Sequence, residues 1–215
     1  GIANIDNAII KNAYSGVFVD EGIVDIDNSE ILSCYSGVHF YRTNYSSGAS
    51  YVTNTRVHNT TVGLDMYMST AHISNNEIDN NYIGINTTSY SSPYLAPNDN
   101  NTSQSVGYNN IHSNSFGIYA LTFSNPWLGR ESCDSFGGNN IINNNTTKDV
   151  NLNSYCTVYA ENNYWGGGPT GSYYIGTGCY FDQYPFLYSP PSQTSTIKIT
   201  PEEEEFNSKF VPQVT

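Results

Sequence analysis

Few residues of this 215-residue chain could carry acid–base chemistry. Polysaccharide lyases need a carboxylate cluster for calcium and a basic residue to take a proton, and the hydrolases need paired or tripled aspartates. His39 and Asp65 stand at matching positions of two similar segments, but no second acid accompanies Asp65. The nearest arginines, Arg42 and Arg56, have no repeated acidic neighbour. His39 and Asp65 are therefore the least unsuitable catalytic pair, and we expect binding or structure rather than catalysis.

A second group of chemical interest is formed by Met66, Met68 and His72, because a Met-x-Met pair is a soft ligand pattern that suits copper. Both methionines fall at positions that alternate toward the interior of a strand, and methionine readily fills irregular gaps in a core. We expect both to be core residues, and we expect no metal and no cofactor.

These candidates are embedded in an internal repeat. Four copies begin with an asparagine that lies nine positions before a glycine, in the pairs Asn7/Gly16, Asn28/Gly37, Asn54/Gly63 and Asn75/Gly84. A fifth, looser copy has Gly117, and in a sixth copy Asp149 takes the place of the glycine. Recurrence in the same order indicates that one structural unit has been copied and stacked.

Within each copy the apolar residues alternate in short runs, such as Val38/Phe40 and Leu64/Met66, which is the period of a strand. Turn-forming residues separate the runs, and no helix-forming run lies between them. The pattern predicts a coil whose turns stack in parallel about 4.8 Å apart. Asparagine would occupy a left-handed corner with its amide bonded to the asparagines above and below, and glycine would occupy a second corner.

On these repeats the chain resembles the right-handed parallel β-helix repeat proteins, the group that holds pectate lyases, polygalacturonases and the periplasmic nitrous-oxide-reductase accessory type. The segment 161–166, followed by Pro169, is similar to the closing turn of many non-enzymatic members. The resemblance implies an all-β, right-handed parallel β-helix of about six to seven turns over residues 1–190, with residues 170–190 as an aromatic closing segment. Trp165 would cover the end of the core. Residues 191–215 form a Pro-rich, acidic tail with one possible strand at 194–200.

Alternation also predicts which side chains of the glycine-led strands face solvent. His39, Asp65, Asn86 and Tyr119 fall in one outward row, and Tyr41 and Tyr67 fall in the next. A polar row beside tyrosines suits a sugar, whose CH faces stack on aromatic rings while its hydroxyls bond to Asn and Asp.

Insertions enter at one corner of the coil and would form loops on one side of the rod. That side is often the binding side of a solenoid, and one of these loops carries Trp127. The alternative interpretation of the whole face is an ordinary solvated sheet.

Composition narrows the partners and the compartment. The formal charge is −12 with only seven Lys and Arg, which argues against nucleic acid. The sequence has no signal peptide and no run of eighteen apolar residues, so no membrane span is expected. Asn, Ser, Thr and 19 Tyr dominate, which is typical of extracellular or cell-surface proteins and less so of periplasmic ones.

Four cysteines are compatible with an oxidising compartment. Cys133 and Cys156 could meet in a disulfide, with Cys179 as the rival partner. Cys34 lies about four turns away, roughly 19 Å at the strand spacing, so we expect a buried thiol there.

Three functions remain open. The first repeat starts without a cap, and the acidic tail should dock on its own rod or on a neighbouring subunit, which together predict self-assembly by end-to-end or strand-exchange contacts. The leading hypothesis is therefore a secreted or cell-surface structural β-helix, self-assembling or part of a larger extracellular fibre or envelope protein. The alternatives are a non-catalytic carbohydrate-binding or adhesion module and a polysaccharide lyase or glycoside hydrolase.

Overall fold

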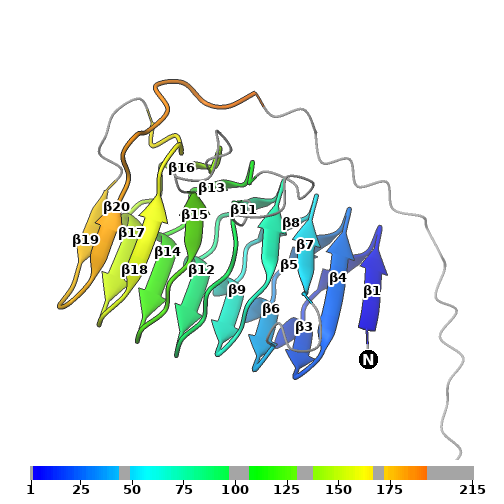
Figure 1. The fold of residues 1–215 in the computed structure, drawn as a ribbon. Coiled ribbons are helices and arrows are strands. Elements are labelled where there is room, and N and C mark those ends of the chain that lie inside the picture. The colour runs from blue at the N-terminus through cyan, green and yellow to red at the C-terminus, as the bar shows by residue number, and fades with distance from the viewer. Residues whose placement is uncertain (1, 44–48, 97–106, 130–137, 167–171, 193–215) are drawn as a thin grey trace, which may run out of the picture.

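The computed structural model describes residues 2–43, 49–96, 107–129, 138–166 and 172–192. These residues form a parallel β-solenoid of about seven coils, each of which passes through sheet A, sheet B and sheet C in turn. Each strand pairs in parallel with the equivalent strand of the next coil (Figure 1). The predicted all-β parallel solenoid is confirmed. In the described part of the chain no helix is long and apolar enough to cross a membrane.

The strands are short and occupy three faces of the rod. Sheet A contains β1 (Ile2–Asp6), β4 (Ile23–Asp27), β7 (Tyr51–Thr53) and β10 (His72–Ser74), followed by β15 (Trp127–Gly129), β18 (Thr157–Ala160) and β20 (Tyr180–Asp182). Sheet B contains β2 (Ile9–Lys11), β5 (Glu30–Leu32), β8 (Arg56–His58), β11 (Glu77–Asp79), β13 (Asn110–His112) and β16 (Ile141–Asn143). Sheet C contains β3 (Ser15–Asp20), β6 (Ser36–Tyr41), β9 (Val62–Tyr67), β12 (Ile83–Thr88), β14 (Phe116–Leu121), β17 (Lys148–Asn153) and β19 (Tyr173–Ile175).

Single bridging residues keep the faces continuous where a strand is missing. Tyr94 bridges β10 and β15 on sheet A, and Tyr164 continues sheet B beyond β16 toward Leu187. The closing segment therefore continues the solenoid, with β19 and β20 as its last strands. Trp165 is only 4% exposed and packs edge-to-face on Phe181, with ring centroids 5.9 Å apart.

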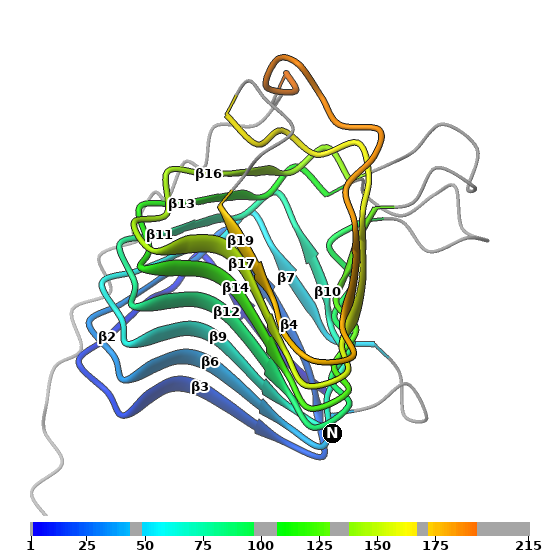
Figure 2. The same cartoon turned by 90° about the vertical axis from the view of Figure 1, so that its left-hand side faces the viewer.

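Side chains of sheet C alternate between core and surface, and its strands lie side by side in Figure 2. Val38 and Phe40 in β6 are fully buried, as are Leu64 and Met66 in β9. The predicted inward positions are confirmed. Met68 is the exception, because it lies at the corner after β9 with a φ of 49° and is 45% exposed. The prediction of Met68 as a core residue is wrong.

Each coil turns its corners with residues in the left-handed backbone region. At the AB corner, between sheets A and B, these residues are Asn7, Asn28, Asn54, Asn75, Tyr108, Asn139 and Asn162. Asparagine is common there because it tolerates positive φ better than most residues. The four asparagines predicted to turn a corner do so, but the amides of Asn28 and Asn54 bond to Asp27 instead of stacking on each other.

The amide ladder lies one residue later than predicted. Asn76, Asn109, Asn140 and Asn163 follow the AB corner residues and are at most 2% exposed. Asn109 Nδ2 donates to Asn140 Oδ1 (2.9 Å) and to the carbonyl of Ile73 (2.8 Å), while its Oδ1 accepts from the backbone N–H and Nδ2 of Asn76. The ladder thus satisfies buried backbone groups where the coil leaves sheet A.

A second ladder runs along the BC corner, between sheets B and C. Asn81, Asn114 and Asn145 bond to one another in the same way, since Asn81 Nδ2 donates to Asn114 Oδ1 (3.1 Å) and Asn114 Nδ2 donates to Asn145 Oδ1 (3.0 Å). Asp149 ends the ladder by accepting from Asn145 Nδ2 (2.8 Å). The acid that replaces the repeat glycine therefore terminates this ladder.

The repeat glycines Gly16, Gly37, Gly63 and Gly84 do not turn a corner, which corrects the prediction. They lie inside sheet C strands, where the chain passes close to the next coil. A Cβ added at Gly37 would lie 2.5 Å from the carbonyl oxygen of Gly63 and 2.5 Å from Val57 Cγ1. Glycine is needed there for close approach of the coils, not for its backbone freedom.

We predict that Asn109→Ala lowers the free energy of unfolding by roughly 3 kcal/mol, because at least two buried polar groups lose partners at about 1–3 kcal/mol each. Urea unfolding followed by circular dichroism measures the change. The matched control is Asn110→Ala, whose side chain faces outward on β13. Equal stability of the two variants would contradict a structural role for the ladder.

Gly37→Ala should lower the free energy of unfolding by roughly 1–3 kcal/mol, the usual cost of overpacking. The same urea titration tests this, with the outward His39→Ala on the same strand as control. A Gly37→Ala protein as stable as the wild type would show that neighbouring coils can move apart without cost.

Candidate functional site

The outward face of sheet C carries the residues that sequence analysis selected for ligand contact. His39, Asp65, Asn86 and Tyr119 are in register on β6, β9, β12 and β14. We call His39, Asp65 and Asn86 the polar row. Because strand side chains alternate between the two faces of a sheet, the same register that buries Leu64 and Met66 turns Asp65 outward.

Direct contacts join the polar row across three coils. Asn86 Nδ2 donates to Asp65 Oδ1 at 2.8 Å, and His39 Nδ1 lies 3.7 Å from Asp65 Oδ2. The side chains of His39 and Asp65 are 26% and 20% exposed, so the carboxylate is reachable from solvent while it is held from both sides. The predicted pair of His39 and Asp65 does come together.

Tyr41 and Tyr67 form the neighbouring outward row. Their rings stack with centroids 5.2 Å apart and an interplanar angle of 12°, and the guanidinium of Arg42 lies 4.9 Å from the centre of the Tyr41 ring. Each tyrosine therefore covers one ring face of the other. The two covered faces cannot stack on a sugar. A sugar could contact this pair only through its hydroxyl groups, its ring edges and the remaining ring surface.

Trp127 lies on a different face from the polar row. It sits on β15 of sheet A, in a column that contains Tyr51, His72, Tyr94, Trp127 and Tyr159. The ring of His72 stacks on those of Tyr51 and Tyr94, and the ring centroids of Trp127 and Tyr159 lie 5.6 Å apart. Burial lowers the pKa of His72 within it. Sequence analysis predicted one ligand-binding set, whereas the structure places Trp127 apart from the others.

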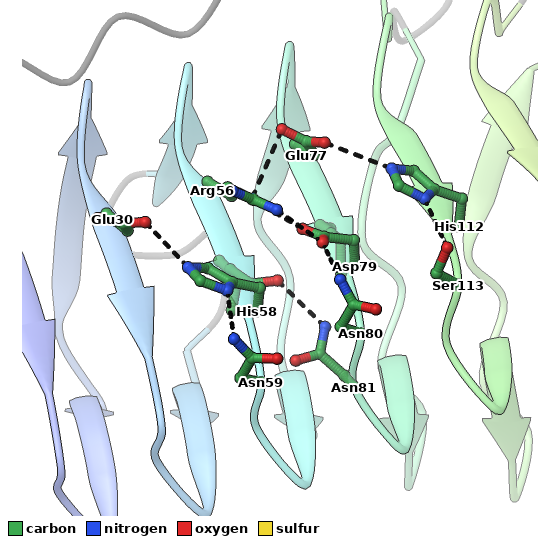
Figure 3. Close-up of polar contacts among 12 residues, drawn as sticks. Glu30, Arg56, His58, Asn59, Glu77, Asp79, Asn80, Asn81, His112 and Ser113 are labelled. Carbon is green, nitrogen blue, oxygen red and sulfur yellow. Dashed lines mark hydrogen bonds and ion pairs between the residues drawn. The ribbon is translucent and has the colours of Figure 1, made fainter.

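A larger charged network lies on the outward face of sheet B (Figure 3). Arg56 Nε and Nη2 donate to the two carboxylate oxygens of Asp79 at 3.0 and 2.8 Å, and Arg56 Nε lies 3.6 Å from Glu77. His112 Nε2 lies 3.4 Å from Glu77 on the other side. These contacts join three coils from β8 to β13.

The network continues toward the N-terminus through His58. Its Nε2 lies 2.9 Å from Glu30 Oε1, and its Nδ1 lies 2.8 Å from Asn59 Nδ2. An amide nitrogen only donates, so Nδ1 accepts and Nε2 carries the proton toward Glu30. Neutral His58 therefore satisfies both neighbours at once.

The charges in this network stabilise the ionised form of its acids. The hydrogen bond to His112, together with the charge of Arg56, holds the pKa of Glu77 below its usual value. Burial alone would raise the pKa of Asp79, but the hydrogen bond and the charge of Arg56 lower it overall. A general acid requires a raised pKa, so this arrangement suits cross-coil pairing better than proton donation.

Sequence analysis missed this network. It considered Arg56 without acidic neighbours, whereas Glu77 and Asp79 lie on the next coil. The signal was present in the aligned copies, because Glu30, Arg56 and Glu77 occupy one column of sheet B and His58 and Asp79 occupy the next. Alternation of inward and outward positions in the strand before the glycine-led strand would have placed these acids and bases on one face.

The described residues form no metal centre, and the acids on sheet C are not paired. The described ranges contain no cluster of three or more His, Cys, Asp or Glu that could hold a metal ion. On sheet C, Asp20 is an acid of the neighbouring row two coils from Asp65, about 10 Å along the axis at the strand spacing. Glycosidase carboxyl pairs lie about 5–9.5 Å apart, so Asp20 and Asp65 are poorly placed for that chemistry.

The cysteines are thiols where the structure describes them. Cys34 is buried, and Cys156 and Cys179 lie on adjacent coils, where the backbone N–H of Cys156 donates to Cys179 Sγ at 3.2 Å. Burial raises the pKa of Cys156 to about 11. Cys133, and the tail from residue 193 onward with its possible strand, lie outside the described residues.

Comparison with known proteins gives a family and nothing more specific. The model of one family, described as Protein of unknown function (DUF1565), matches residues 2–171. This range runs from the start of β1 to beyond the end of β18. Searches of curated proteins and of solved structures found no match.

We predict that the sheet B network makes stability depend on acid pH. Glu77 and Asp79 have lower pKa values in the folded than in the unfolded protein, so their contribution is complete at neutral pH and is lost as the pH falls below about 4. Asp79→Asn should lower the free energy of unfolding at pH 7 by about 1–3 kcal/mol and flatten its decline between pH 4 and 2.

Urea titrations across this pH range provide the test. Asp20→Asn, an exposed acid at the end of β3, is the control. An Asp79→Asn protein whose stability falls with acid as steeply as that of the wild type would show that the network contributes nothing.

Proposed function

The chain belongs to the DUF1565 family, which is a family of β-helix proteins, and from this premise we propose that it is a non-catalytic carbohydrate-binding rod of the cell exterior. The observation that carries the proposal is the polar row on sheet C. It is solvent-accessible, it is held in place by contacts across coils, and it lies beside tyrosine hydroxyl groups.

The polar row offers the mixture of groups that sugar hydroxyls require. A hydroxyl both donates and accepts, and the row presents the carboxylate of Asp65, the amide of Asn86 and the imidazole of His39. The contact between Asn86 and Asp65 fixes both side chains before a ligand arrives, which reduces the entropy lost on binding.

The overall charge favours a neutral glycan. At −12, the chain would repel a polyanionic polysaccharide, and the centre of the polar row is itself a carboxylate. A neutral sugar gains the hydrogen bonds without this repulsion.

Binding is favoured over cleavage because Asp65 lacks a suitably placed second carboxyl on the described part of sheet C. Its two oxygens face His39 and Asn86. This geometry holds an acceptor in one position, which is useful for recognition and insufficient for the two-carboxylate mechanism.

Self-assembly and an extracellular location rest on the sequence. The tail, which was expected to dock on its own rod or on a neighbouring subunit, lies outside the described residues from position 193 onward. Carbohydrate binding is the leading proposal because it is supported by contacts among described residues. The surface rich in Asn, Ser, Thr and Tyr supports a location outside the cell.

Asp65→Ala and Asn86→Ala should each weaken binding of a neutral oligosaccharide by at least about tenfold, the effect of losing a hydrogen bond of about 1.4 kcal/mol in a bound complex. A glycan array identifies the ligand, and isothermal titration calorimetry measures the affinity. Asn110→Ala, an outward amide on sheet B, is the matched control for Asn86→Ala and should bind as the wild type does.

Two results would count against this function. Either the wild-type protein binds no neutral glycan, or both variants keep full affinity. Release of reducing ends from a bound polysaccharide would show instead that the protein is an enzyme.

A further inference from the structure

The CA corner, between sheets C and A, changes its construction along the rod. After β3, β6 and β9 a single residue with positive φ turns the corner: Glu21, Arg42 and Met68. After β12, β14 and β17 two consecutive residues do so: Ser89–Tyr90, Thr122–Phe123 and Ser154–Tyr155.

Hydrogen bonds identify Tyr90, the second residue of the first pair, as an insertion. The backbone N–H of Ser69 donates to Ser91 Oγ at 3.1 Å, just as the N–H of Thr43 donates to Ser69 Oγ. Ser91 and Ser69 therefore occupy equivalent positions. One residue, Met68, precedes Ser69 at the corner, whereas Ser89 and Tyr90 precede Ser91, so Tyr90 has no counterpart on the preceding coil.

The second residues of all three pairs are aromatic, and their rings stack on one another. Tyr90 and Phe123 have ring centroids 5.3 Å apart and an interplanar angle of 7°, and Phe123 and Tyr155 are 5.2 Å apart at 10°. Their exposed fractions are 66%, 42% and 54%. We call Tyr90, Phe123 and Tyr155 the aromatic fin.

The residue types of the fin are not those that its backbone favours. The φ angles are 69°, 60° and 62°, where glycine or asparagine is the least strained choice and a bulky aromatic is uncommon. Strain of this kind is typical of functional sites. The same strained backbone recurs on three consecutive coils, and each time it carries an aromatic ring that is exposed to solvent. We infer that these rings contact a ligand or partner rather than the core.

The two ends of the fin differ. At the Tyr155 end, Gly178 lies against the ring at a φ of 69°, and a Cβ added there would collide with Tyr155. At the Tyr90 end the preceding corner has Met68 and no inserted residue. Among the residues that the structure describes, only Phe123 stacks on Tyr90, so the second face of the Tyr90 ring is left without an aromatic partner.

We propose that this second face of Tyr90 is a stacking site for a pyranose ring of a neutral glycan. This inference rests on the proposed function and adds to it an exposed aromatic ring face, which the polar row lacks. Tyr41 and Tyr67 are only partly exposed, whereas Tyr90 is 66% exposed and stands at the end of the fin.

The position of the fin agrees with a shared ligand. Tyr90 follows Thr88 by two residues, and Thr88 is in register with Tyr67. One oligosaccharide can thus place a CH face on Tyr90 and its hydroxyl groups along sheet C. An acidic sugar is the weaker candidate because of the net charge of −12.

The test uses the full chain and hexasaccharides of glucose, xylose, mannose and N-acetylglucosamine, measured by isothermal titration calorimetry. For the hexasaccharide that the wild type binds most tightly, Tyr90→Ala and Tyr90→Leu should each weaken binding about tenfold, and Tyr90→Phe should retain it because the ring face is kept. Tyr14→Ala is the matched control, because Tyr14 is 74% exposed and stacks on Tyr35 at a different corner. Urea unfolding verifies that every variant is folded.

The outcomes separate this inference from the function it rests on. If Tyr90→Ala binds like the wild type while Asp65→Ala does not, the stacking site is wrong and the binding face on sheet C stands. If the wild type binds none of the hexasaccharides, both the stacking site and the carbohydrate-binding function are wrong. Sedimentation could instead show that the wild type is a dimer and that Tyr90→Ala is a monomer. The second face of Tyr90 would then contact another copy of the chain, and the proposal would be wrong.

Discussion

Satisfaction of the backbone at the corners is the constraint on which the rest of this solenoid depends. Every coil turns through the left-handed region at its corners, and the residue after the turn enters the interior with polar backbone groups that water cannot reach. The ladders that end at Asn163 and at Asp149 supply the missing partners coil after coil. Because each amide bonds to the amide above and below it, the ladders also fix the register between coils. Every outward column inherits that register.

Stacking in register turns copies of a sequence into columns of side chains, and most columns satisfy themselves. Like residues stack, as Tyr41 and Tyr67 do, and each hides a face of the other. Unlike charges alternate, as Glu30, Arg56 and Glu77 do, and Arg56 forms an ion pair with Glu77 on the next coil. A well-formed column therefore stiffens the rod while it removes binding groups from the surface. Groups that can bind a ligand are found where a column is mixed or where it stops.

The sequence predicted the features that depend on period alone. Alternation identified the buried Phe40 and Leu64 and the outward Asp65, and the repeat placed Asp149 in the glycine column. It failed where a residue type has two possible physical roles. Gly37 could provide left-handed freedom or close approach, and only the distance to Gly63 separates these roles. Asparagine likewise has two roles at adjacent positions, because Asn75 turns the AB corner and Asn76 belongs to the buried ladder.

The parts of the candidate site that escaped prediction depend on contacts between coils whose insertions differ in length. The pairing of Arg56 with Asp79 requires the exact register of β8 and β11, and the one-residue insertion at Tyr90 is hidden by a much longer insertion that follows it. The polar row is a mixed column, and the fin is a column that stops at Tyr90. These are the two kinds of discontinuity that leave groups unsatisfied by the rod itself. The two lie close together along the chain, because Tyr90 follows Asn86 by four residues across the turn after Thr88, and this proximity is the strongest structural reason to assign them to one ligand.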